Sequence, residues 1–292
     1  MRVLVTGASG AIGSALVPEL LGAGHEVVGL ARSEASAAAL TAAGADVLRG
    51  DLAHLDTLRS GAAAADGVVH LAFSHDFTDF AASAEAEGRA VAALGEGLVG
   101  TGKPLVLASG TPVVPGRTAT EEDAMPTDGP VGGRGRTAAA TLALADRGVR
   151  AAVVRLPRTV HAHGTGGFAG LLVDIARRTG VSGYVGDGTQ RWPAVHRLDA
   201  ARLFRIALEQ APAGSVLHAV ADEGDRMRDI AAAIGRRLDL PVDEVPGDDY
   251  GFLGAVFALD QPASSARTRE RFGWTPTGPS LLADIAAAPD AA

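Results

Sequence analysis

Short apolar runs alternate with alanine-rich segments of helical length through the first third of this 292-residue chain. The apolar runs cover residues 2–6, 26–30, 45–48, 67–72 and 104–108, and the alanine-rich segments lie near 11–22, 34–43, 55–64 and 79–98. Strands that alternate with helices form βαβ units, whose strands are parallel. Continuous apolar strands are expected where helices cover both faces of a sheet. The chain is therefore predicted to fold as an α/β protein with a doubly wound parallel sheet.

The remaining sequence extends this pattern and then becomes mixed. Further elements are expected as a helix near 136–147, strands at 150–156 and 215–220, and a helix at 226–238. The length allows about two domains. We expect a dinucleotide-binding Rossmann domain at 1–160, with its sheet completed by parts of 190–220. Residues 161–292 are expected to form mainly a small C-terminal substrate lobe.

Composition excludes several classes of function. The net charge is −8 and no basic stretch stands out, so neither nucleic acid nor an anionic membrane is an expected partner. The absence of cysteine excludes disulfides and thiolate metal sites. No signal-peptide pattern and no apolar run of about 18 residues is present. A cytoplasmic monomer or homodimer that acts on a small molecule is expected.

A glycine-rich turn, "TGASGAIG" at 6–13, directly follows the first apolar run. Gly7 would permit a tight turn, Gly10 a close backbone approach to a pyrophosphate, and Gly13 close packing of helix on strand. Free N–H groups at the start of the next helix would bind the pyrophosphate. The alternative is a glycine turn without a ligand, but its place at the start of an alternating β/α chain favours dinucleotide binding.

The G-x-x-G-x-x-G spacing resembles that of short-chain dehydrogenases/reductases, in their extended, epimerase-like branch. "GDL" at 50–52, "HLAF" at 70–73, "LASGT" at 107–111, "VVRLP" at 153–157 and the helix start within 194–209 fall where that family has related motifs. The resemblance implies cofactor contacts from Gly7, Ser9, Gly10, Ala11, Ile12, Gly13, Asp51, Leu52, Leu71, Ala72, Phe73, Ser109, Leu156 and Pro157.

The end of the second strand favours NADP(H) over NAD(H). NAD enzymes place an acidic residue there to bind the ribose 2′-hydroxyl, but this chain has Ala31, followed by Arg32 and Ser33. Arg32 can pair with a 2′-phosphate, and no carboxylate would repel it. The alternative for Arg32 is an ordinary solvated helix start.

The family's catalytic Tyr-x-x-x-Lys pair is missing. The resemblance places the tyrosine near Gly132 or Gly133 and the lysine near Arg136, and Lys103 is the only lysine in the chain. Arg136 keeps a cation that can bind ribose, but an arginine does not deprotonate and cannot tune a base. Thr111 matches the family's catalytic hydroxyl. The chain therefore resembles an atypical member of the family.

The proton must then come from another group, and Tyr184 is our candidate. It lies in the glycine-rich segment 180–196, which matches the family's substrate-pocket segment and permits close backbone approach to a ligand. A phenol with a pKa near 10 is protonated at neutral pH and can act as an acid. Water and His161 are the alternatives, and Tyr184 as an ordinary half-buried strand tyrosine remains open.

Other residues are candidates for contact with substrate. These are His75, Thr111, His161, Tyr184 and Trp192. His161 and His163 have the spacing of a metal-binding pair, but no carboxylate cluster lies near them in the sequence, so no metal site is predicted. His75 has the alternative of a solvated loop or a helix cap.

These features predict an enzyme, an NADPH-dependent reductase of a small or medium ketone, enone or similar carbonyl compound, with an atypical proton donor. Two alternatives stay open. One is a redox-inactive NADP-binding sensor or partner-binding protein, which the missing tyrosine and lysine favour. The other is an isomerase, dehydratase or cyclase on the same scaffold.

Overall fold

The computed structural model describes residues 1–74, 79–129 and 132–288. The chain divides into two compact units that interleave along the sequence. Unit 1 comprises Met1–Ser109, Ala124–Arg155 and Ala201–Leu217, and unit 2 comprises Gly110–Asp123, Leu156–Ala200 and His218–Ala292.

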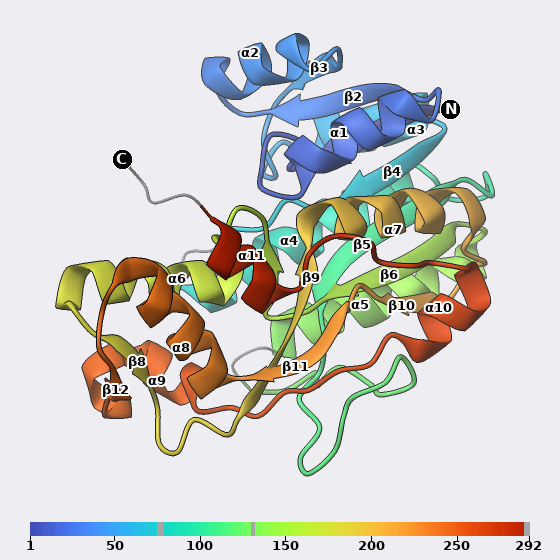
Figure 1. The fold of residues 1–292 in the computed structure, drawn as a ribbon. Helices are drawn as coiled ribbons and strands as arrows, with labels where there is room; N and C mark the ends of the chain where they lie inside the picture. Colours follow the sequence, from blue (N-terminus) through green and yellow to red (C-terminus); the bar gives the residue numbers. More distant parts are fainter. Residues whose placement is uncertain (75–78, 130–131, 289–292) are drawn as a thin grey trace. The chain divides into compact units, whose positions relative to one another are not determined.

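Unit 1 is built on a seven-stranded sheet (Figure 1). In spatial order its strands are β10 (Ser215–His218), β6 (Arg150–Leu156), β5 (Pro104–Gly110), β4 (Gly67–His70), β1 (Arg2–Thr6), β2 (Glu26–Ala31) and β3 (Asp46–Arg49). Strand β1 pairs in parallel with both β2 and β4, and the chain continues outward from each of them in turn. This order confirms the predicted doubly wound sheet.

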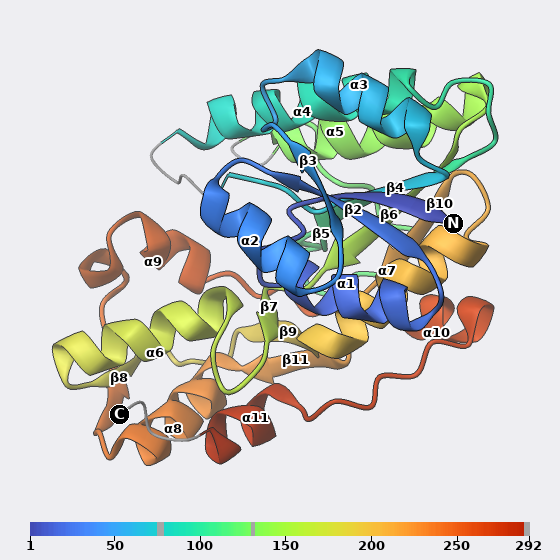
Figure 2. The same cartoon turned by 90° about the horizontal axis from the view of Figure 1, so that it is seen from above.

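Helices cover both faces of this sheet. They are α1 (Gly13–Gly22), α2 (Glu34–Ala42), α3 (Leu55–Ala64), α4 (Phe80–Glu96), α5 (Gly132–Ala143), followed by the 3-10 turn η1 (Leu144–Arg147), and α7 (Arg197–Gln210). Figure 2 shows α3, α4 and α5 on one face, and α1 and α7 on the other. Val3, Leu4 and Val5 of β1 are fully buried between these layers, which explains the continuous apolar run.

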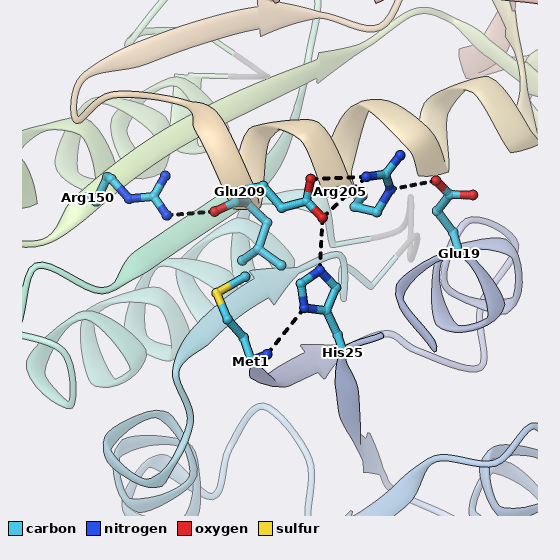
Figure 3. A network of polar contacts seen from close by, with 7 residues as sticks. Met1, Glu19, His25, Arg150, Arg205 and Glu209 are labelled. Carbon is cyan, nitrogen blue, oxygen red and sulfur yellow. Dashed lines mark hydrogen bonds and ion pairs between the residues drawn. The ribbon is translucent and has the colours of Figure 1, made fainter. Parts of the chain in front are cut away.

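A network of polar contacts connects elements of unit 1 near the amino ends of β1 and β2 (Figure 3). His25 Nε2 lies 2.9 Å from Glu209 Oε1, and Arg205 donates to both Glu209 (3.0 Å) and Glu19 (2.7 Å). Arg150 donates to the carbonyl oxygens of Leu208 (2.7 Å) and Ala211 (2.9 Å) at the end of α7. The network joins β2, α1 and α7 at the end of the sheet away from the glycine turn.

Unit 2 has two small sheets and a set of helices (Figure 1). Its strands are β7 (Thr159–His161), β8 (Ser182–Tyr184), β9 (Arg191–His196), β11 (Asp222–Arg226) and β12 (Val242–Glu244), ordered β11-β9-β7 and β12-β8. Its helical segments are α6 (Gly167–Thr179), α8 (Met227–Leu238), η2 (Gly247–Tyr250), α9 (Phe252–Phe257), α10 (Ala266–Phe272) and α11 (Leu281–Ala287). Trp192, Phe257 and Met227 lie at the centre of its apolar core, where each is fully buried.

Most predicted elements of unit 1 are confirmed to within a few residues, whereas those of unit 2 were predicted incompletely. The helix expected near 136–147 begins earlier, at Gly132, and its last residues form the 3-10 turn η1. The sequence after 238, for which no helix or strand was predicted, contains among others α10 and α11. Among the described residues, no helix combines the length and apolar character needed to cross a membrane.

Candidate functional site

The glycine turn of unit 1 is closed by contacts that leave no room for side chains. Gly7 has φ +69°, and a Cβ there would lie 2.8 Å from the backbone nitrogen of Ala72. A Cβ on Gly13 would lie 2.2 Å from the carbonyl oxygen of Gly7. The N–H of Gly10 donates to the same oxygen at 3.0 Å. Positive φ and close backbone packing therefore require glycine at 7 and 13.

The start of α1 presents unpaired backbone donors. Ile12, the N-cap residue, makes no side-chain capping bond. The N–H groups of Ala11, Ile12 and Gly13 donate to no acceptor in the described part of the chain. Such N–H groups and the helix dipole favour a bound anion. Ser9, also predicted to contact cofactor, lies exposed in the same turn.

A buried hydroxyl at the end of β5 also fits a bound dinucleotide. Ser109 is 2% exposed, and its Oγ makes no hydrogen bond with any residue that the structure describes. A buried polar atom without a partner carries a desolvation cost that a ligand can remove. The glycine cradle, the free N–H groups and Ser109 together fit a nicotinamide dinucleotide.

At the end of β2, the position of the expected acidic residue is taken by the buried Ala31, and the next residue, Arg32, is exposed. Ser33 caps α2: its Oγ accepts from the N–H of Ser36 at 3.2 Å. Arg49, at the end of β3, donates to the carbonyl oxygen of Ser33 at 3.3 Å. Arg49 was not among the predicted site residues, although β-strand register places it opposite Ala31.

Asp51 and Leu52 follow β3 and open the turn before α3. The carboxylate of Asp51 accepts from the N–H of Ala53 (2.8 Å) and from His54 Nδ1 (2.7 Å). The bond from Ala53 is the main reason that the pKa of Asp51 lies below its ordinary value. Asp51 is therefore held as an ionised, half-exposed acceptor, and Leu52 is half-buried beside it.

His70, the last residue of β4, fixes the loop that carries Leu71, Ala72 and Phe73. Its Nδ1 lies 2.8 Å from Thr6 Oγ1, which also accepts from the N–H of Ala72 at 3.3 Å. Burial, with a smaller contribution from the charge of Arg134, lowers the pKa of His70 to about 3. His70 is thus neutral near pH 7, and its bond to Thr6 ties the carboxyl ends of β1 and β4 together.

Arg134, which the sequence analysis missed, reaches the ends of β4 and β5. Its guanidinium donates to the buried carboxylate of Glu87 (2.9 Å) and to the carbonyl oxygen of Ala108 (2.7 Å), and its carbon lies 4.2 Å from the centroid of the Phe73 ring. Burial raises the pKa of Glu87, and the charge of Arg134 opposes this rise. A paired cation is therefore held beside Phe73, a predicted cofactor contact.

Arg136, predicted to bind ribose, lies on the side of α5 that faces a groove with α4. Its guanidinium is exposed, donates to the carbonyl oxygen of Thr127 at 2.5 Å, and lines a groove of about 510 Å³ between α4 and α5. Residues 134 and 136 are two positions apart, so they point to opposite sides of a helix. Helical spacing could therefore have predicted that the side chains of Arg134 and Arg136 do not reach the same site.

The expected tyrosine position is closed by backbone. A Cβ on Gly132 would lie 2.5 Å from the carbonyl oxygen of Thr127, and one on Gly133 would lie 2.7 Å from the Cβ of Ala84. A Cβ on Gly135 would lie 2.0 Å from the carbonyl oxygen of Pro126. The first turn of α5 is packed too closely to accept a tyrosine side chain without rearrangement.

In unit 2, Thr111 is positioned by residues distant in sequence. It is 4% exposed, and its N–H donates to the carbonyl oxygen of Leu156 at 2.9 Å, next to the buried Pro157. Gln261 Nε2 donates to the carbonyl oxygen of Thr111 at 2.6 Å and to its Oγ1 at 3.3 Å. Because Oγ1 accepts from Gln261, the hydroxyl proton of Thr111 remains available for donation.

His161 forms a buried pair with Asp284. Its Nδ1 donates to Asp284 Oδ2 at 2.8 Å, and that carboxylate also accepts from the N–H of Gly164 at 3.0 Å. Burial raises the pKa of Asp284, but these two bonds together with the charges of His161 and His196 outweigh it, so the pKa lies below its ordinary value. His161 Nε2 is buried without a partner among the described residues. The ring of His196 lies 5.5 Å away, edge to face.

Tyr184 and Trp192 occupy different environments. Tyr184 ends β8, is half-buried against the apolar core of unit 2, and its hydroxyl makes no hydrogen bond within the described chain. Trp192 is fully buried, and its indole N–H donates to the carbonyl oxygen of Leu259 at 3.3 Å. Trp192, predicted to contact substrate, is therefore enclosed in the core of unit 2.

His75 lies outside the described residues. Within the described ranges 1–74, 79–129 and 132–288, no group of three or more histidine, aspartate or glutamate side chains is arranged to hold a metal ion. His163 is exposed, with a φ of +56°.

Comparison with known proteins gives both a family and a fold. A family model described as "NAD dependent epimerase/dehydratase family" matches residues 3–219. The chain is 47% identical over 292 residues to "Uncharacterized protein C2A9.02" of Schizosaccharomyces pombe, covering 98% of each chain. It is 45% identical over 294 residues to "Uncharacterized protein YLL056C" of Saccharomyces cerevisiae, also covering 98% of each.

Solved structures share the fold at low identity. The dTDP-glucose 4,6-dehydratase DesIV of Streptomyces venezuelae, solved with NAD and TYD bound, is similar with a TM-score of 0.78 and 21% identity. The alignment covers 99% of this chain and 95% of DesIV. The α/β fold with a Rossmann-like sheet is thus shared with a nicotinamide dinucleotide-binding protein.

Proposed function

The chain belongs to the NAD-dependent epimerase/dehydratase family, and from this premise we propose that it is a cytoplasmic NADPH-dependent reductase of a small or medium carbonyl compound. The family and the fold support a nicotinamide dinucleotide as cofactor. The observation that carries the proposal is the Thr111 hydroxyl, which Gln261 holds with its proton free, two residues after the buried and unpartnered Ser109.

The cofactor-binding residues are proposed as follows. The N–H groups of Ala11, Ile12 and Gly13 bind the pyrophosphate, and Ser109 supplies a buried hydroxyl. Arg32 pairs with the 2′-phosphate, since Ala31 stands in the position of the acidic residue of NAD enzymes. When bound, the nicotinamide supplies the hydride.

Arg134 is proposed to replace the family's lysine as the cation beside the cofactor. Its pair with Glu87 and its bond to Ala108 hold the guanidinium against Phe73. An arginine there stays charged and does not exchange a proton at neutral pH. Arg134 is therefore assigned to binding and orientation, with proton transfer left to another group.

Thr111 is proposed to donate a hydrogen bond to the substrate carbonyl oxygen as negative charge develops there. Tyr184 is the proposed proton donor, because its hydroxyl makes no hydrogen bond to the described residues and a phenol is protonated at neutral pH. The Asp284–His161 pair is the alternative, since the bond to Asp284 fixes the imidazole and leaves Nε2 for proton exchange.

The test is a panel of ketones, aldehydes and enones incubated with the protein and NADPH, followed by loss of NADPH absorbance. Oxidation of NADPH that requires both a carbonyl compound and the protein is expected. Calorimetry with NADPH serves as the control for cofactor binding. Tight NADPH binding without turnover of any compound would contradict the reductase assignment and favour a redox-inactive NADP-binding protein.

Specific observations keep two other functions open to that test. The closed backbone at Gly132 and Gly133 favours a protein that binds NADP without redox turnover. The fold shared with a dTDP-glucose 4,6-dehydratase favours an isomerase or dehydratase. Product analysis of the same incubations distinguishes these functions, because a dehydratase or isomerase changes the substrate without net loss of NADPH.

A further inference from the structure

Arg158 carries a guanidinium without a polar partner. It lies between β6 and β7, and its guanidinium carbon is 5.4 Å from the ring centroid of Phe168 and 5.2 Å from that of Trp192. Its Nε is buried, and within the described chain the side chain makes no hydrogen bond and no ion pair. The guanidinium of Arg158 therefore lies against two aromatic rings.

This arrangement leaves a charge partly removed from water without compensation. Burial lowers the pKa of Arg158 to about 10, and no carboxylate of the described residues opposes this change. An arginine with that pKa remains charged near pH 7. Aromatic faces attract a cation, but they accept none of the five N–H donors of the guanidinium in the plane of its fork.

Other arginines of unit 2 show how such a charge is usually satisfied. Arg269 also lies over a tryptophan, 5.7 Å from the centroid of Trp274, but it donates to Ser265 Oγ and to two backbone carbonyl oxygens. Arg191 makes a bidentate pair with Asp260. Arg158 has the aromatic support of Arg269 but lacks the acceptors that both others have.

The acidic residues of β11 and α11 do not supply an acceptor to Arg158. Asp284 accepts from His161 and Gly164, and Asp222 accepts from the N–H of Leu281. Asp225 Oδ2 is buried without a partner among the described residues, and the pKa of Asp225 is raised by burial and by two other aspartates, with no contribution from an arginine. The acceptor that would complete Arg158 is thus not supplied by these side chains.

We propose that Arg158, supported by the rings of Phe168 and Trp192, binds a carboxylate or phosphate group of the substrate. A guanidinium fork matches two oxygens of either group. Phe168 is half-buried, so its exposed part can contact an apolar portion of the same molecule. The assignment of this anion to the substrate rests on the proposed reductase function. It restricts the proposed substrates to carbonyl compounds that carry a carboxylate or phosphate.

The test measures anion binding without turnover. The protein is saturated with NADP⁺, so that the dinucleotide site is filled, and its Tm is followed with inorganic phosphate or with succinate at constant ionic strength. A ligand that binds only the native state raises Tm in proportion to ln(1 + [L]/Kd), so the rise begins near the Kd and its concentration dependence gives that Kd. We expect such a rise in the wild type and a fitted Kd at least about tenfold higher in Arg158→Met.

Arg269→Met is the matched control, because it also removes a guanidinium from a tryptophan face. Its Tm without anion is expected to fall, since it loses three hydrogen bonds, while its response to anion remains that of the wild type. Arg158→Met is expected to keep or raise the Tm without anion, because it removes an unpaired charge and keeps the apolar contacts. Arg158→Gln repeats the measurement with a polar neutral side chain.

The outcomes separate the possibilities. A response to phosphate alone or to succinate alone identifies the group that is bound. Equal responses in the wild type and in Arg158→Met, or no response to either anion, overturn the proposal. A fall in the Tm of Arg158→Met and Arg158→Gln like that of Arg269→Met, or failure of both to fold, assigns Arg158 a structural role and also overturns it.

A second experiment links the site to turnover. Keto acids are compared with their neutral methyl esters, and Arg158→Met is expected to raise KM at least about tenfold for the acids only. An equal change for acids and esters contradicts the assignment to the substrate anion. If neither class is reduced, the reductase proposal fails, while the anion-dependent Tm still decides whether Arg158 binds an anion.

Discussion

Unit 1 and unit 2 position their polar groups by different means. In unit 1 the predicted phosphate site consists of consecutive backbone N–H groups at Ala11, Ile12 and Gly13, which a single strand-to-helix turn presents. In unit 2 the polar groups are side chains whose hydrogen-bond partners lie far away in the sequence. Thr111 and Gln261 are 150 positions apart, and His161 and Asp284 are 123 positions apart.

This difference determines what kind of ligand group each unit can recognise. A backbone cradle reads charge and shape, and it needs only glycines at fixed spacing. Side-chain pairs such as Gln261 with Thr111 and Asp284 with His161 fix the orientation of single donors and acceptors. In the proposed function, unit 1 binds the cofactor, and unit 2 determines which substrate reacts and how its proton is delivered.

The largest expected effect concerns the proton donor in unit 2. Tyr184→Phe keeps the ring against the apolar core and removes only the acid, so kcat for reduction should fall by about a hundredfold to ten-thousandfold. The measurement is steady-state reduction with saturating NADPH. Because a phenol without a nearby lysine is a poor base, reduction at pH 7 should also be much faster than alcohol oxidation.

The companion variant His161→Gln distinguishes the two candidates. If Tyr184 is the donor, His161→Gln should change kcat little, because the amide can still bond to Asp284. If Tyr184→Phe reduces substrate at the wild-type rate and His161→Gln loses the activity, the proton comes from the Asp284–His161 pair. Full activity of both variants would show that neither Tyr184 nor His161 donates the proton, and water would then be the candidate donor.

A smaller effect is expected at Thr111. Thr111→Val removes the donor to the carbonyl oxygen, which should lower kcat by about a hundredfold and leave NADPH affinity unchanged. Gln261→Leu keeps the hydroxyl but removes its positioning bonds, so a lesser loss is expected, mainly in kcat rather than KM. Stopped-time assays and NADPH calorimetry on both variants provide the readouts. A fully active Thr111→Val would mean that the reacting carbonyl lies elsewhere.

The next effect belongs to unit 1 and tests its choice of nucleotide. Arg32→Ala should weaken NADPH binding by about tenfold to a hundredfold, because one charge-assisted contact to phosphate contributes about 1.5–3 kcal/mol. NADH binding should not change, since NADH lacks the 2′-phosphate. Calorimetry with both nucleotides measures the preference. Arg49→Ala is the control: a loss of preference in this variant alone would move the phosphate contact from β2 to β3.

The same contrast limits what the sequence could predict. The order of strands in unit 1 and its glycine turn follow from local patterns, because parallel strands and their crossover helices are contiguous in sequence. Arg134 was missed because its partners Glu87 and Ala108 come from other elements, and the family spacing pointed to Arg136 instead. Gln261, Asp284 and Arg158 were missed for the same reason. Their roles depend on tertiary contacts that no local pattern encodes.

The smallest expected effect is a pH dependence of stability that originates in unit 1. Burial lowers the pKa of His70 to about 3 from the ordinary value of 6.5. Between these values the unfolded chain binds a proton at this position and the folded chain does not, so the free energy of unfolding falls as the pH falls below about 6.5. One such proton corresponds to a slope of up to about 1.4 kcal/mol per pH unit, and the contribution is complete above that window.

His70→Asn isolates this slope from other titrations. The amide can still bond to Thr6 Oγ1 but does not titrate, so the variant should lose less stability than the wild type between about pH 7 and about pH 5, whatever its absolute stability. Denaturant unfolding at several pH values measures both slopes. Asp225, whose pKa burial raises to about 6, titrates in the same window in both proteins and cancels from the difference. Identical slopes would show that His70 takes up a proton in the folded state, and therefore that water reaches the end of β4.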